Sequence, residues 1–173
     1  MSIHGKKDFL QSELEKLVEA GGHKIQVSVE EKSRGYTITY QRGVDADVIE
    51  RMKAVPDEDK PANWKKAGYF DNLEAYRHDV TVSVKQDEIE IKSRDPYSRV
   101  NEFGFDVGQF DDIEHFSAGG CIFNATGGQV TIQRAYTGEI DKKFVEEVYT
   151  MIERTYDATS LIPLLETELQ DLE

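Results

Sequence analysis

Apolar residues recur at two different spacings in the first quarter of this chain. Between residues 9 and 20 the spacing is three to four, which places four apolar side chains on one face of a helix: Leu10, Leu14, Leu17 and Val18. The glycine pair that follows is a typical helix end. The spacing then changes to two over residues 25–29 and again over residues 36–40, with a turn across residues 31–35. This alternation predicts an antiparallel hairpin with one buried face.

The same alternation predicts two more hairpins later in the chain. Residues 80–84 and 89–91 alternate on either side of a polar turn at residues 86–87. Residues 121–125 and 129–134 flank the pair Gly127-Gly128. A glycine pair supplies the positive φ angles that tight hairpin turns need, so we expect a third hairpin there.

Three further amphipathic segments are predicted to be helices: a short one between residues 45 and 55, a long one from Glu139 to Tyr156, and a last one after Ser160. We therefore expect an α+β fold. It has a single antiparallel sheet of about six strands built from three hairpins, with N-terminal and C-terminal helices packed on one face. Residues 1–156 form this single domain, and residues 157–173 form an acidic amphipathic C-terminal helix or tail.

Charge adds information about partners. The formal net charge is −13 at pH 7, from 34 acidic and 21 basic residues. Such a field disfavours nucleic-acid binding and attracts basic partners, although solubility alone would also account for it. The first residues lack the apolar segment of a secretion signal, and no apolar run approaches the roughly 20 residues of a membrane helix. We expect a cytoplasmic protein without a membrane segment.

Familiar catalytic motifs are absent from the sequence. No nucleotide-binding or hydrolase motif is present, so we predict no enzymatic activity and no cofactor. Cys121 has apolar neighbours and no adjacent base, which favours an inert thiol. Residues 111–115 hold the densest set of potential metal ligands, but their spacing matches no known ligand loop, and a metal-assisted hydrolase using Asp111, Asp112 and His115 is the remote alternative. The remaining histidines are predicted to lie at the surface: His4, His23 and His78.

Two segments are candidates for function. Residues 97–116 interleave aromatic and acidic side chains, which is typical of binding surfaces, although the aromatics would also serve to cover the core. The leucine stripe after residue 160 must bury against this domain, a second copy or another protein. The predicted partner-binding residues are Tyr97, Phe103, Phe105, Phe110, Asp111, Asp112, Glu114, Phe116, Leu161, Leu165, Leu169 and Leu172.

We therefore predict a non-enzymatic acidic interaction protein, acting as an inhibitor, adaptor or chaperone, that binds a basic surface of a protein partner. A homodimer through the C-terminal helix is a further option. The element order and low pI are similar to those of small acidic secretion chaperones and of acidic inhibitors carried by mobile elements, and this resemblance assigns no residue. The alternative is a small-molecule-binding domain, with a pocket between the curved sheet and the long C-terminal helix lined by Tyr36, Tyr40, Phe103 and Phe105.

Overall fold

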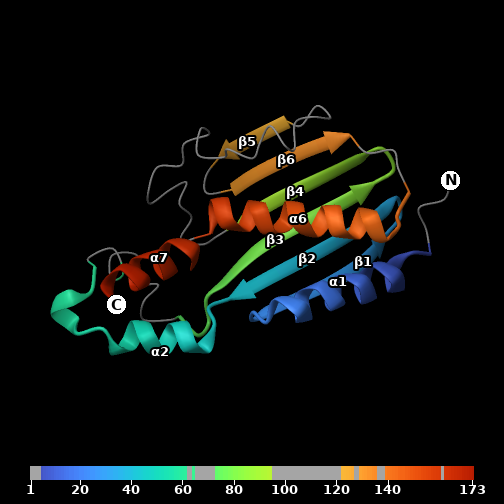
Figure 1. Cartoon of the computed structure of the whole chain (residues 1–173). Helices are drawn as coiled ribbons and strands as arrows, with labels where there is room; N and C mark the ends of the chain where they lie inside the picture. Colours follow the sequence, from blue (N-terminus) through green and yellow to red (C-terminus); the bar gives the residue numbers. More distant parts are fainter. Residues whose placement is uncertain are drawn as a thin grey trace.

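The computed structural model describes residues 5–61, 64, 73–94, 122–126, 129–135, 139–160 and 162–173. Figure 1 shows how the elements of these residues are arranged, with helices in front of a twisted sheet. In chain order the elements are α1 (Lys7–Gly21), β1 (Ile25–Lys32), β2 (Gly35–Gly43), α2 (Ala46–Ala54), the 3-10 turn η1 (Asp57–Asp59), β3 (Arg77–Lys85), β4 (Glu88–Arg94), β5 (Ile122–Thr126), β6 (Gln129–Ala135), α6 (Lys142–Thr159) and α7 (Ile162–Leu172).

The strands pair as antiparallel neighbours in one sheet, in the order β1-β2-β3-β4-β6-β5. The prediction of an α+β fold with one antiparallel sheet is confirmed. The first turn is shorter than predicted, because Lys32 pairs with Gly35 and leaves only two residues between β1 and β2. The predicted glycine turn at residues 127–128 lies outside the described residues. The order places β1 at one edge of the sheet.

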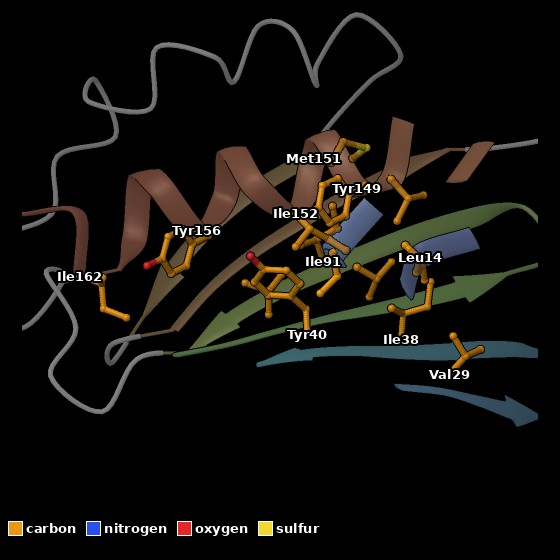
Figure 2. Packing of buried hydrophobic residues seen from close by; sticks show 14 of the residues in the cluster. Leu14, Val29, Ile38, Tyr40, Ile91, Tyr149, Met151, Ile152, Tyr156 and Ile162 are labelled. Carbon is orange, nitrogen blue, oxygen red and sulfur yellow. The ribbon is translucent and has the colours of Figure 1, made fainter. Parts of the chain in front are cut away.

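The two faces of the sheet differ because successive side chains point to opposite sides. One face is covered by α1 and α6 (Figure 1), and its central strands carry buried apolar side chains in register: Tyr36, Ile38 and Tyr40 opposite Val84, Val82 and Val80. Figure 2 shows Leu14 of α1 and Ile152 of α6 packed into this layer. The opposite face carries polar side chains that are partly or fully exposed: Thr37, Thr39, Thr81, Ser83 and Lys92. Among the described elements, the helices therefore cover one face of the sheet, and the other is an open polar face.

Helix α6 begins three residues later than predicted. Asp141 is its N-cap, and the Phe144 N–H donates to Asp141 Oδ1 at 2.9 Å. This bond satisfies one of the free N–H groups of the first turn, so the helix begins after Asp141 and not at Glu139. At its other end the helix continues to Thr159. The Ile162 N–H then donates to Ser160 Oγ at 3.1 Å, and α7 begins there.

Helix α7 lies beside α2, at the end of the sheet where β2 ends and β3 begins (Figure 1). Arg51 Nε of α2 donates to Glu173 Oε2 at 3.0 Å. Leu165 and Leu169 belong to the hydrophobic core, whereas Leu172 is 41% exposed. The described part of the leucine stripe therefore packs mainly against its own chain.

Candidate interaction surface

The edge strand β1 is bound from the side by one residue of α1. Gln11 Nε2 donates to the Val27 carbonyl oxygen at 2.9 Å, and the Val29 N–H donates to Gln11 Oε1 at 2.7 Å. The same Nε2 donates to Glu15 Oε1 at 2.7 Å, which holds the side-chain amide in position. Backbone groups on a sheet edge are a template for pairing with another chain. Gln11 covers two of these groups on β1.

An open groove of about 440 Å³ follows the same edge. Helix α1 lines it with Glu15, Val18 and Glu19, and β1 lines it with residues 25–28. Thr39 and Gln41 of β2, whose side chains lie on the open face of the sheet, also line it. We call this the edge groove.

The edge groove combines apolar and acidic side chains. Val18, Ile25 and Val27 are buried or half-buried and give it an apolar wall, whereas Glu15 and Glu19 are exposed. Interfaces of proteins that associate specifically have this arrangement, with an apolar centre and a charged or polar rim. The sign of the rim favours a partner with positive charge.

A second polar feature is buried between α6 and the sheet, around Arg42. The Arg42 side chain is 9% exposed, and its Cζ lies 4.3 Å from the centroid of the Tyr156 ring. Tyr40 stands edge-on to Tyr149 and Tyr156, with centroids 6.4 Å apart in both pairs (Figure 2). His78 lies in the same cluster, and its Nε2 is 2.9 Å from Ser93 Oγ.

Burial changes the acidity of this cluster. Desolvation raises the pKa of Tyr149 to about 12, and the nearby carboxylate of Glu153 adds to that increase. Desolvation also raises the pKa values of Glu153 and Glu166, while the positive charge of Arg42 opposes the increase. An arginine over an aromatic ring, with carboxylates close by, is a stabilising arrangement. We interpret the cluster as the contact that fixes α6 and α7 to the end of β2.

The structure places the predicted site residues in two classes. Leu165 and Leu169 are buried in the core, and Leu172 is exposed on α7. The remaining predicted residues lie outside the described part of the chain: Tyr97, Phe103, Phe105, Phe110, Asp111, Asp112, Glu114, Phe116 and Leu161. A homodimer through α7 would have to use its exposed residues, since two of its leucines already pack against this chain.

Sequence reasoning missed the edge groove. Gln11, Glu15 and Glu19 lie on the polar side of an amphipathic helix, where such residues are ordinary, and the strand order that makes β1 an edge is not visible in the sequence. The spacing of Gln11 and Glu15 by one helical turn is the only signal of their contact. The prediction that His78 lies at the surface is wrong, because it is 0% exposed. His23 is exposed as predicted.

Comparisons give no relative from which to transfer a function. No protein-family model matches the chain, and no curated protein or solved structure matches it either. Within the described residues, no group of three or more histidine, cysteine, aspartate or glutamate side chains could hold a metal ion. None of the described helices combines the length and the apolar character that a membrane crossing requires.

Proposed function

We propose that this chain is a non-enzymatic interaction protein that binds a basic protein partner, acting as an inhibitor, adaptor or chaperone. The observation that carries the proposal is the edge groove, which joins an apolar wall to the exposed carboxylates of Glu15 and Glu19. Apolar contact gives such an interface its affinity, and opposite charge speeds encounter and selects the partner. The net charge of −13 acts in the same direction.

The packing under α6 favours this function over the small-molecule alternative. Tyr36 and Tyr40, which were predicted to line a ligand pocket, are 1% and 0% exposed and belong to the core. Phe144, Val148 and Ile152 of α6 belong to the same core. These buried side chains lie between α6 and the sheet, where that pocket was expected, and Phe103 and Phe105 lie outside the described residues.

The test is binding of purified small basic proteins, with an acidic protein of similar size as the control. Affinity is measured by biolayer interferometry at about 0.01 M and about 0.15 M salt, between which the Debye length shortens from about 30 to about 8 Å. We expect the basic proteins to bind and their affinity to fall as salt rises. Equal affinity for the acidic control, or affinity that does not depend on salt, would overturn the proposal.

Variants then locate the surface. Glu15→Gln with Glu19→Gln neutralises the edge groove, whereas Glu13→Gln of α1 with Glu146→Gln of α6 removes the same charge from a hollow between those two helices. We expect the first double variant to lose more affinity than the second. Equal losses would mean that net charge, and not the edge groove, determines binding.

A further inference from the structure

The backbone of β1 points alternately toward β2 and away from the sheet. In an antiparallel pair, residues that exchange hydrogen bonds with the partner strand alternate with residues whose N–H and C=O groups point outward. Gln11 binds the carbonyl of Val27 and the N–H of Val29, which shows that the odd-numbered residues of β1 point outward. The outward-facing backbone therefore includes Ile25 and Val27, which line the edge groove, and continues to Val29 next to it.

Gln11 binds this edge with the groups that a neighbouring strand would use. Its side chain ends in a planar amide, whose N–H groups donate and whose oxygen accepts as those of a peptide unit do. It donates to a strand carbonyl and accepts from a strand N–H, at 2.9 and 2.7 Å. The edge therefore accepts amide groups at these positions, and the amide present belongs to a half-buried side chain that can rotate away.

We propose that an extended basic segment of a partner adds as a strand to the edge of β1, displacing the Gln11 amide and lying in the edge groove. Main-chain hydrogen bonds give affinity in this mode, and alternate side chains give specificity. This inference rests on the proposed function, since it names the surface and the conformation through which a basic partner binds.

Charge distinguishes a basic partner from a second copy of this chain. Edge-to-edge pairing of two β1 strands would bring Glu15 and Glu19 of one copy toward the same residues of the other. Like charges facing each other destabilise an interface, whereas lysine or arginine side chains on an added strand meet the glutamates favourably. The acidic rim therefore favours a basic strand and opposes self-pairing.

The experiment uses the full chain and a fluorescent synthetic peptide of alternating lysine and valine. Fluorescence anisotropy gives the dissociation constant for this peptide. Two control peptides separate the contributions: one replaces each lysine with glutamate, and one carries N-methyl groups on every second amide and so cannot pair as a strand. We expect the lysine peptide to bind, and both control peptides to bind at least about tenfold more weakly, which corresponds to about 1.4 kcal/mol.

Gln11→Ala tests the displacement. The variant leaves the Val27 carbonyl and the Val29 N–H without the side-chain amide, so the peptide no longer competes with it. We expect the lysine peptide to bind about tenfold more tightly to Gln11→Ala than to the wild type, which corresponds to about 1.4 kcal/mol. Gln170→Ala, at an exposed glutamine of α7, is the matched control and should bind as the wild type does. Thermal melting confirms that both variants fold.

Three outcomes would overturn strand addition. The first is an N-methylated peptide that binds as well as its parent. The second is an unchanged affinity of Gln11→Ala for the lysine peptide. The third is a Gln11→Ala variant that forms dimers on size-exclusion chromatography without gaining affinity for the peptide. The last result would assign the edge to a second copy. Failure of the proposed function is a different observation, because basic proteins would then show no salt-dependent binding at all.

Discussion

Two leucines on α7 offer a direct test of how the C-terminal helix is used. Leu169 is 0% exposed and Leu172 is 41% exposed, although both occupy the same helix and the same predicted stripe. Truncation of each to alanine changes helix propensity by the same small amount. A difference between Leu169→Ala and Leu172→Ala therefore reports the packing of the two side chains.

The expected magnitudes differ severalfold. Removing a fully buried leucine side chain costs about 2–5 kcal/mol, because apolar contact is lost and a cavity remains. For a chain of this length that is a fall in Tm of about 4–20 °C, at about 2–4 °C per kcal/mol. Leu172→Ala should cost about 1 kcal/mol or less, because part of its side chain is already in water and no closed cavity forms.

Urea unfolding followed by tryptophan fluorescence measures both free energies. Trp64 is the only tryptophan and is fully buried, so its emission reports the loss of the core. Losses that agree within about 0.5 kcal/mol would refute the placement of α7, since surface substitutions differ by no more than that. If Leu172→Ala keeps its stability but loses affinity for a basic partner, the exposed end of the stripe belongs to the binding surface.

Two further predictions concern acidity and backbone. Desolvation raises the pKa of Glu153 in the folded protein. The folded state therefore gains stability from the protonated carboxyl below the ordinary pKa of about 4.3, and this gain is lost as the pH rises through the raised pKa. Glu153→Gln should therefore raise Tm near neutral pH and lose this advantage in acid. If Tm changed with pH in the same way for Glu153→Gln and for the exposed control Glu146→Gln, the burial of Glu153 would be contradicted. A Cβ at Gly35 would lie 1.8 Å from the Val84 carbonyl oxygen, whereas one at Gly21 would meet nothing closer than 3.7 Å. Urea unfolding should show Gly35→Ala strongly destabilised and Gly21→Ala stabilised by up to about 1 kcal/mol, and equal effects would refute the close approach at Gly35.

The fold class could be predicted because each element carries its own period. Alternation in residues 25–40 follows from a sheet with one covered face, and the α1 stripe follows from a helix that covers it. Helix boundaries were less predictable, since the start of α6 depends on which acidic residue acts as N-cap, and Asp141 and Glu139 are both acidic. Only the bond from the Phe144 N–H distinguishes them.

The buried polar cluster shows where hydrophobicity fails as a guide. Each of the strands β2, β3 and β4 has a polar residue at an inward-facing position: Arg42, His78 and Ser93. Each of these lies two places along its own strand from an inward-facing apolar residue. His78 was predicted to be exposed, but the period of two places all three side chains inside. Tertiary contacts decide the outcome, because Tyr156 covers Arg42 and Ser93 contacts His78. The alternation alone, followed past the apolar residues, would have predicted these positions as buried.

The edge groove required information that no local pattern contains. A strand pattern does not say whether the strand is central or at an edge, and β1 matters because nothing pairs with its outer side in the described sheet. Natural sheets protect such edges with charge or with covering side chains. Gln11 and the two glutamates of the rim do both. The same protection would select between added strands. A neutral or acidic strand would leave the glutamate charges unpaired. A basic strand would neutralise them, and its backbone amides would replace the amide of Gln11. Under the strand-addition proposal, protection against self-association and recognition of a basic strand are two consequences of one arrangement.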